Sequence, residues 1–368
     1  MLSNIYAQED EKEFDIRPFQ VTFITPLGTN GTAAPRIINR LSLNILAGYN
    51  AGVDGFELSG FLNLSVDYVK GLQIAGFGNI AGGKADAAQI AGFMNIDGGN
   101  VSGLQTAGFI NIAGGDADAA QIAGFANLSG DFEGVQVSGF GNIAGETNGV
   151  QVAGFGNLAE ESEGMQVGGF MNISQDLKGI QAAGFLNVAR NVKGLQIAGF
   201  LNICDTIDGL AIAPVSIVKN GGYRRFEFWG NETFFMNTSF KIGVRHFYTV
   251  YTLGFRPVAN EFNTAVGFGA GTNIGLTNNN SIDIEAHTYT VNKNFWEHWY
   301  YNFLNQLRVS FNYQIYEHFS IFAGPTFNIL VADIEPYADD IAPSWAFNIA
   351  DRKDSIRGWF GFNAGMRF

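Results

Sequence analysis

A repeat with a period of 15 to 16 residues occupies residues 55–218 and restricts the folds open to this chain. Its core reads Gly-Φ-Gln-Φ-Ala-Gly-Phe-x-Asn-Φ, where Φ is aliphatic, and Gly71–Ile80 and Gly194–Ile203 are nearly identical copies. The Gly-Phe pair recurs at a spacing of 16 residues four times and then 15 residues five times. A degenerate copy follows at Gly209–Val218, and Leu43–Tyr49 resembles the first half of a unit. Glycine recurs throughout without a 3.6-residue apolar period, so the units are predicted to be strands and the polar connectors turns.

Two all-β architectures accommodate such units. In a β-solenoid each repeat forms one coil, and equivalent residues stack about 4.8 Å apart, Phe on Phe and Asn on Asn. In a large membrane barrel each ten-residue unit would be one spanning strand. The units lack the Tyr and Trp girdles of membrane strands, and their connectors lack a sustained alternation of long and short. We therefore favour the solenoid for residues 19–220 and keep the large barrel as the alternative.

Residues 221–368 follow a different pattern, because Tyr, Trp and Phe become frequent and longer segments alternate between apolar and polar residues. An antiparallel transmembrane β-barrel of about eight strands is predicted here. The predicted strands are Arg224–Phe234, Thr238–His246, Phe247–Pro257, Asn263–Leu276, Asn280–Val291, Asn302–Ile315, His318–Val331 and Arg357–Phe368.

The alternation assigns a face to each side chain. In Asn302–Ile315 the odd positions from Leu307 to Tyr313 are apolar, while the even positions from Gln306 to Gln314 are polar or charged. An apolar outside and a polar inside are typical of a membrane barrel. A soluble β-sandwich, which would bury the apolar face instead, is the alternative.

An eight-stranded barrel is narrow, and side chains fill its interior. We expect the inward ionisable residues to form a paired network, because unpaired buried charges are very costly. These residues are Arg225, Glu227, Lys241, Arg245, Asp283, Glu285, His287, Arg308 and Arg367. The run Asp283, Glu285, His287 is also the best catalytic candidate, but the network interpretation is favoured, and no catalytic residue and no open pore are predicted.

Loop lengths predict an orientation. The connections after the third, fifth and seventh strands are longer, with 25 residues between Val331 and Arg357, and those after the second, fourth and sixth strands are tight. Long loops are typical of the extracellular side, so the C-terminus, residue 223 and the repeats are predicted to be periplasmic. Trp296, Trp299 and Tyr300 lie in one such loop. They are interpreted as an interface belt or as a contact surface for a sugar or protein.

Composition excludes several classes. Charged residues make up 15% of the chain and the net charge is −13, which disfavours nucleic acid as a partner. The single cysteine, Cys204, excludes an internal disulfide and is interpreted as a packed small residue. The four histidines show no metal-ligand spacing, so no cofactor or metal is predicted. Residues 1–18 are expected to be disordered or processed, since MLSNIYAQ lacks a signal-peptide core but fits the end of one cut after Ala7.

The GLQIAGFxNI units, the PLGTNG stretch at Pro26–Gly31 and the terminal Phe368 resemble surface-repeat outer-membrane proteins of Bacteroidota-type bacteria. The resemblance extends from about Phe19 to the end of the chain. It implies an outer-membrane location, and the final Phe resembles the signal read by the barrel-assembly machinery. Proteins of this kind are largely without an assigned activity, so the resemblance implies little about function. The family label places the repeats at the surface, whereas the loop lengths place them in the periplasm, and both placements stay open.

Three functional hypotheses follow. The favoured one is a non-enzymatic structural or interaction protein, whose barrel anchors a rigid repeat platform that docks partner proteins or surface ligands. The second is a channel or transporter in which the repeats join one barrel of about 20 strands. The third, a barrel hydrolase, depends on the segment Asn280–Val291 alone. The expected partners are the lipid bilayer and other outer-membrane or periplasmic proteins.

Overall fold

The computed structural model describes residues 14–258, 261–293, 302–332, 341–351 and 355–368. Strands make up 75% of the described residues, and they form a parallel β-solenoid of about 12 turns and a closed antiparallel barrel of eight strands. None of the described residues belongs to a helix with the length and hydropathy that a membrane crossing requires. The chain divides into two compact units between Gly184 and Phe185.

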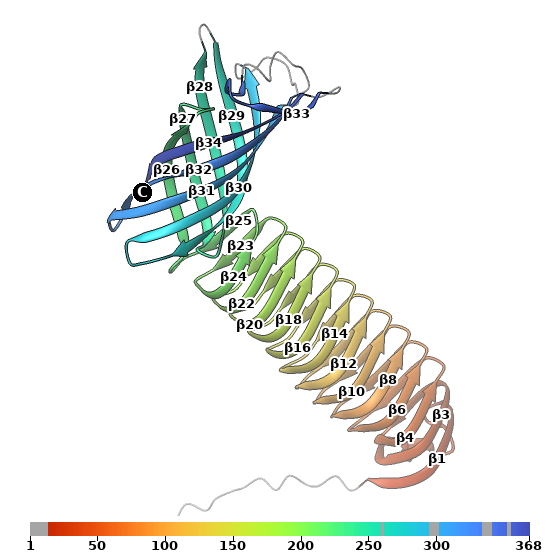
Figure 1. Cartoon of the computed structure of the whole chain (residues 1–368). Helices are drawn as coiled ribbons and strands as arrows, with labels where there is room; N and C mark the ends of the chain where they lie inside the picture. Colours follow the sequence, from red (N-terminus) through yellow and green to blue (C-terminus); the bar gives the residue numbers. More distant parts are fainter. Residues whose placement is uncertain (1–13, 259–260, 294–301, 333–340, 352–354) are drawn as a thin grey trace, which may run out of the picture. The chain divides into compact units, whose positions relative to one another are not determined.

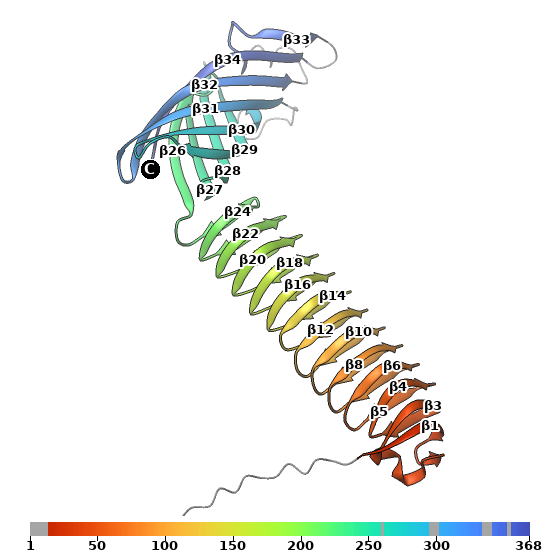
Figure 2. The ribbon, with the colours of Figure 1, turned by 60° about the horizontal axis from the view of Figure 1, so that its bottom comes forward.

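Each coil of the solenoid contains one longer strand and one short strand. In a representative coil, β6 (Val69–Ala75) leads through a bend at Gly76 and Phe77 into β7 (Gly78–Ala81). β6 pairs in parallel with the longer strands before and after it, and Gln73 lies opposite Gln89 in the next coil. Figures 1 and 2 show the successive coils side by side from two directions. The favoured solenoid is therefore confirmed, and the predicted ten-residue strand is two strands separated by the Gly-Phe bend.

The other repeat strands follow the same scheme. The longer strands are β4 (Gly52–Ser59), β8 (Ala85–Ala91), β10 (Val101–Ala107), β12 (Ala117–Ala123), β14 (Phe132–Ser138), β16 (Glu146–Ala153), β18 (Glu161–Gly168), β20 (Asp176–Ala183), β22 (Asn191–Ala198) and β24 (Thr206–Ile212). The short strands are β5 (Leu62–Ser65), β9 (Met94–Asp97), β11 (Ile110–Ala113), β13 (Ala126–Leu128), β15 (Gly141–Ile143), β17 (Gly156–Leu158), β19 (Met171–Ile173), β21 (Leu186–Val188), β23 (Leu201–Cys204) and β25 (Val215–Val218).

The N-terminal end of the solenoid departs from the repeat. β1 (Asp15–Ile24) pairs in parallel with β3 (Ile37–Asn50), and β2 (Leu27–Gly28) and the 3-10 helix η1 (Gly31–Arg36) connect them. β3 contains the half unit seen in the sequence and pairs with both β4 and β5, so it begins the array. Most of the predicted disordered N-terminus lies outside the described residues, and the last residues of that range, from Asp15 on, belong to β1.

The solenoid interior is polar, because the bend turns Phe outward while glutamine and asparagine point inward. Gln73 and Asn79 are fully buried, and so are their equivalents in the following coils. Asn79 donates hydrogen bonds to Asn95 Oδ1 at 2.8 Å and to the main-chain oxygen of Ile90 at 3.1 Å. Such ladders satisfy buried amides only when every coil supplies the same residue at the same place. This requirement explains the low variability of the repeat.

The barrel belongs to a separate nine-stranded sheet, so the single large barrel of the alternative is not formed. Its strands are β26 (Tyr223–Asn231), β27 (Met236–Val244), β28 (Phe247–Val258), β29 (Glu261–Gly275), β30 (Asn280–Lys293), β31 (Asn302–Tyr316), β32 (Phe319–Ala332), β33 (Phe347–Asp351) and β34 (Ser355–Arg367). β34 pairs with both β32 and β26, which closes the barrel. All eight predicted strands are present, and β33 is an additional strand on β34 that the sequence did not indicate.

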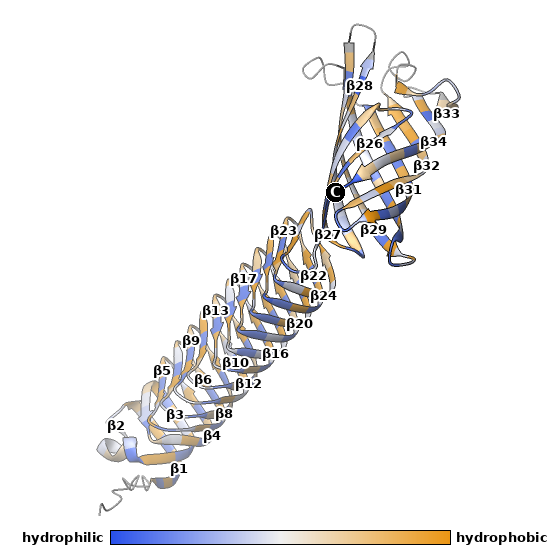
Figure 3. Ribbon diagram, turned by 90° about the vertical axis from the view of Figure 1, so that its left-hand side faces the viewer, coloured by the Kyte–Doolittle hydropathy of each residue, from blue (hydrophilic) through white to orange (hydrophobic). Residues whose placement is uncertain are grey.

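The two faces of the barrel wall match the predicted alternation. On β31, Leu307 and Phe311 are 48% and 50% exposed on the outside, whereas Arg308 and Ser310 are fully buried inside. Figure 3 shows apolar and polar residues alternating along the barrel strands. The outer surface of the barrel is therefore apolar and its interior polar, which is the reverse of a soluble β-sandwich.

The connections differ from the prediction at one point. β28 ends at Val258 and β29 begins at Glu261, so the expected longer loop after the third strand is wrong. Both strands are longer than expected at this end, because their antiparallel pairing continues to Val258 and Glu261. The connections after β30 and β32 are the longer ones, as predicted, and most of their residues lie outside the described part of the chain.

Candidate functional site: the charged interior of the barrel

Strand register brings the inward ionisable residues into direct opposition. Glu285 on β30 lies opposite Arg308 on β31, and Glu227 on β26 lies opposite Arg367 on β34. Side chains directly opposite on one face of an antiparallel pair have Cβ atoms about 5 Å apart. The alternation of the sequence places these four residues inside, and the register then pairs each carboxylate with a guanidinium.

Arg308 connects two carboxylates across the barrel. Its Nε donates to Glu285 Oε2 at 2.8 Å and its Nη2 to Glu227 Oε2 at 2.9 Å. Its guanidinium also lies over the Trp229 ring, 4.5 Å from the centroid. A planar guanidinium that is both stacked and paired through two nitrogens is held in one orientation.

Lys241 occupies the centre of the network. Its Nζ lies 2.7 Å from Glu227 and 2.8 Å from Asp283, and it also contacts Glu285. Arg367 completes the network by donating from Nε to Glu227 Oε1 at 2.7 Å and by pairing with Asp283. Three carboxylates and three cations thus compensate one another, and each is at most 4% exposed. Buried charges are tolerated when they are paired in this way.

His287 belongs to the same cluster. Its Nε2 lies 3.1 Å from Glu285 Oε2, which also binds Arg308. Asp283 accepts a 2.6 Å hydrogen bond from Asn273, in addition to its contacts with Lys241 and Arg367. The carboxylates of the catalytic candidate are therefore occupied by cations and amides of the protein. Within the described ranges, no group of three or more His, Cys, Asp or Glu is placed to hold a metal ion.

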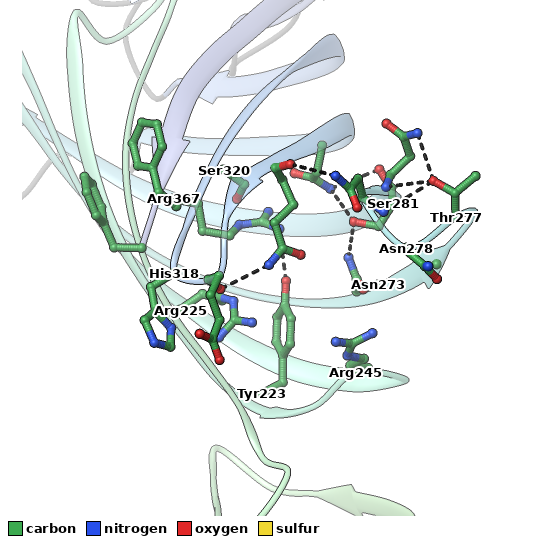
Figure 4. A pocket seen from close by; sticks show the side chains of 18 residues that line it. Tyr223, Arg225, Arg245, Asn273, Thr277, Asn278, Ser281, His318, Ser320 and Arg367 are labelled. Atoms are coloured by element: carbon green, nitrogen blue, oxygen red, sulfur yellow. Dashed lines mark hydrogen bonds between the residues drawn. The ribbon is translucent and has the colours of Figure 1, made fainter.

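Two of the nine predicted network residues lie outside the network. Arg225 lies opposite Lys241 in the register, and its guanidinium turns away to bind the main-chain oxygen of Arg224 at 2.9 Å. Arg245 is exposed in the turn after β27. Both line a polar pocket of about 80 Å³ at this end of the barrel. Figure 4 shows Arg225, Arg245 and His318 around this pocket, which we call the mouth pocket. Arg367 also lines it and donates a hydrogen bond to the hydroxyl of Tyr223.

The sequence analysis missed the aromatic and amide partners of the network. Tyr248 donates to Glu285 Oε1 at 2.6 Å, and Trp229 Nε1 donates to Ser239 at 2.8 Å. Nearer the other end, Glu232 accepts from Trp359 Nε1 at 2.8 Å and from the main-chain nitrogen of Phe362 at 3.0 Å. The alternation could have placed Tyr248, Trp229 and Trp359 inside, since each lies at an inward position of its strand. The predicted loop contacts Trp296, Trp299 and Tyr300 lie outside the described residues.

The solenoid contains two buried carboxyl groups of its own. Burial raises the pKa of Glu57, and hydrogen bonds from Gln73, Ser42, Asn44 and Asn50 lower it by less. Burial likewise raises the pKa of Asp97 to about 7, against hydrogen bonds from Gln89 and Gln105.

The cysteine is also a solenoid core residue. Cys204 is 1% exposed, and burial raises the pKa of its thiol to about 11. The buried thiol is therefore protonated at neutral pH, and the thiolate is the reactive form of cysteine.

Comparison with protein-family models, with curated proteins and with solved structures yields no match to this chain. The candidate function therefore depends on the geometry of the barrel and the solenoid themselves.

Proposed function

We propose that this chain is a non-enzymatic integral outer-membrane protein, in which the barrel is an anchor without an open pore and the solenoid is a rigid docking platform. The observation that carries the proposal is the inverted barrel wall. Large apolar side chains such as Phe311 and Phe360 are 50% and 70% exposed outside, while charged residues such as Lys241 and Arg308 are fully buried inside. Hydrocarbon outside and a filled polar interior are the conditions under which this arrangement is stable.

The charge network supports an anchor over a channel. Side chains from β26, β27, β30, β31 and β34 meet across the interior, and Arg308 reaches both Glu285 and Glu227. An ion would have to break these pairs to pass. The channel hypothesis also needed the repeats as barrel strands, and the repeats form a sheet of their own.

Turn lengths support an orientation. At one end of the barrel the connections are Arg245–His246, Leu276–Asn279 and Glu317–His318, which contain two to four residues each. At the other end the connections after β30 and β32 cover residues 294–301 and 333–354. Short turns are typical of the periplasmic side, so the mouth pocket and the first residue of β26 would face the periplasm.

The solenoid supports the platform. Its coils repeat one geometry held by parallel pairing and by two amide ladders, so its surface presents the same groups at regular intervals along the stack. Partners of the platform would be other outer-membrane or periplasmic proteins, and the acidic composition disfavours nucleic acid.

Two experiments test the proposal. The full chain reconstituted into a planar bilayer is expected to show no conductance steps of the size of a general porin, and such steps would refute the anchor without a pore. In native cells, a photo-crosslinking residue in place of the exposed Glu133 is expected to yield discrete protein adducts. If this variant forms no protein adducts when the cells are irradiated, the docking platform is refuted.

A further inference from the structure

One edge of the solenoid carries four parallel ladders of apolar side chains. In a representative coil these are Leu72 and Ile74 on the longer strand, Phe77 at the bend and Ile80 on the short strand. The ladders continue in register through the coils because equivalent residues pair directly. Between Phe56 and Ile217 no charged residue occupies any of these four positions. Figure 3 shows the resulting continuous bands of apolar colour along the coils.

These side chains are held outward and partly exposed to solvent. From Phe61 to Phe170, successive Phe rings stack with centroids 4.8 to 5.1 Å apart. Phe125 is 40% exposed, and its aliphatic neighbours Ile122 and Ile143 are 46% and 45% exposed. At about 4.8 Å per coil, the Phe ladder from Phe61 to Phe170 is roughly 35 Å long. A continuous apolar surface of this length on a protein indicates an interaction site.

The chemistry of the edge fits hydrocarbon better than a protein partner. The residues that contribute most of the binding energy at protein interfaces are mainly Trp, Tyr and Arg side chains that fill pockets. None of these residue types occupies the four ladders, and the edge presents the same relief in every coil. Such a surface does not distinguish one protein from another, whereas hydrocarbon requires only that the surface be apolar.

Charge is segregated to the opposite edge. There the connectors and strand starts of neighbouring coils line a groove of about 390 Å³ with eight carboxylates and a single lysine, Lys178. The carboxylates are Asp116, Asp118, Asp131, Glu133, Glu146, Glu161, Glu163 and Asp176. Anionic lipid headgroups would repel this edge, so it faces water when the apolar edge is in lipid. The solenoid therefore has one apolar edge and one acidic edge, which is the amphipathic arrangement of a membrane element that lies in the interface.

The last coil is tied to the barrel wall. Only Lys219–Gly222 separates β25 from β26, and four residues reach at most about 15 Å. The main-chain oxygen of Pro214 also accepts hydrogen bonds from Thr249 at 2.7 Å and Tyr251 at 2.6 Å. Thr249 and Tyr251 lie on the same outward face of β28 as Leu253, and the proposed function places this face in lipid. The apolar edge is therefore tethered beside a bilayer, where its effective concentration is high.

We infer that the solenoid lies against the membrane leaflet with its Phe and aliphatic ladders inserted among the lipid chains and its acidic edge in water. This inference rests on the proposed membrane anchor. It identifies the lipid surface as the occupant of the apolar edge and leaves the acidic edge free for a partner.

Spin labels on the full chain in lipid vesicles test the inference. Single cysteines at Ile122 and Leu158 report the apolar edge, Glu133→Cys reports the acidic edge, and Leu253→Cys reports the barrel wall. The background is Cys204→Ala, since Ala189 occupies the same place in the preceding coil. Labels at positions 122 and 158 are expected to be several-fold less accessible to a water-soluble nickel relaxant, and more accessible to oxygen, than the label at position 133.

Two outcomes would overturn the inference while the anchor stands. In the first, labels at 122, 158 and 133 are equally accessible to nickel while the label at 253 is protected, which means that the rod projects away from lipid. In the second, labels at 122 broaden one another at every lipid-to-protein ratio, which means that a second copy covers the edge. Nickel access at 253 as well would instead refute the membrane anchor itself, so the two failures are distinguishable.

Discussion

The side-chain amide of Gln73 donates a 2.8 Å hydrogen bond to Oε2 of Glu57, and this contact sets the direction of the glutamine ladder. Glu57 occupies the place of a glutamine in the first coil, and its carboxyl oxygens accept from surrounding donors. Gln73 therefore turns its oxygen to the next coil, where Gln89 donates to it at 3.0 Å. The asparagine ladder runs in the opposite sense, from Asn79 to Asn95.

Replacing Glu57 is expected to weaken the N-terminal coils. Glu57→Ala leaves four buried donors without their acceptor and should destabilise these coils by about 2–4 kcal/mol. Glu57→Gln keeps one acceptor oxygen and should have a smaller effect. Hydrogen exchange of the amides in β3 to β6 measures the difference, and wild-type protection in Glu57→Ala would contradict the capping role.

The buried Asp97 is expected to make the solenoid less stable as pH rises. Burial raises its pKa from 3.8 to about 7, so folding favours the protonated form. Its contribution is fully present below about pH 3.8 and is lost as pH rises to about 7, by up to about 4 kcal/mol. Asp97→Ala reproduces the alanine of the neighbouring coils, Ala81 and Ala113, and should remove this slope.

Urea unfolding followed by circular dichroism at pH 5 and pH 8 tests this prediction. The exposed Asp86→Ala is the matched control and should keep the wild-type slope. An unchanged pH dependence in Asp97→Ala would refute the assignment.

In most coils a glycine on the longer strand has a positive φ, whereas Ala87 and Ala119 occupy the equivalent place in two of them. Gly164 has a φ of +122°, and a Cβ there would lie 2.1 Å from the main-chain oxygen of Gly149. Gly164→Ala should therefore lower the stability of the solenoid by about 2 kcal/mol or more. Gly141→Ala is the control, since its Cβ would lie 3.3 Å from the nearest atom and Ala126 occupies the equivalent place. Equal melting temperatures for the two variants would contradict the prediction.

Removing the central cation is expected to weaken the barrel. Lys241→Met leaves three buried carboxylates with two guanidinium groups, and breaking a buried pair costs about 3–5 kcal/mol. Arg225→Met at the mouth of the barrel is the control and should change little, because Arg225 lies outside the network. The temperature at which the barrel loses its compact mobility in detergent gels measures both. A smaller shift for Lys241→Met than for Arg225→Met would argue against the network.

Periodicity was sufficient to predict the solenoid, the eight barrel strands and the face of most strand side chains, because each of these depends on local repetition. It was not sufficient to predict which inward side chains lie at the same level along the barrel axis. Arg225 and Arg367 both point inward by alternation, yet only Arg367 reaches the carboxylates, since Arg225 lies opposite Lys241. Cross-strand register determines such partners, and register arises from pairing between distant segments. The same reason explains why β33 and the extended β28–β29 hairpin were missed.

The most direct measurement of the central claim is flotation of the full chain with lipid vesicles after a carbonate wash. The apolar wall formed by residues such as Phe311 and Phe360 predicts that the chain floats with the vesicles and needs detergent to leave them. A chain that stays at the bottom of the gradient, and remains monodisperse in buffer without detergent, would contradict the account.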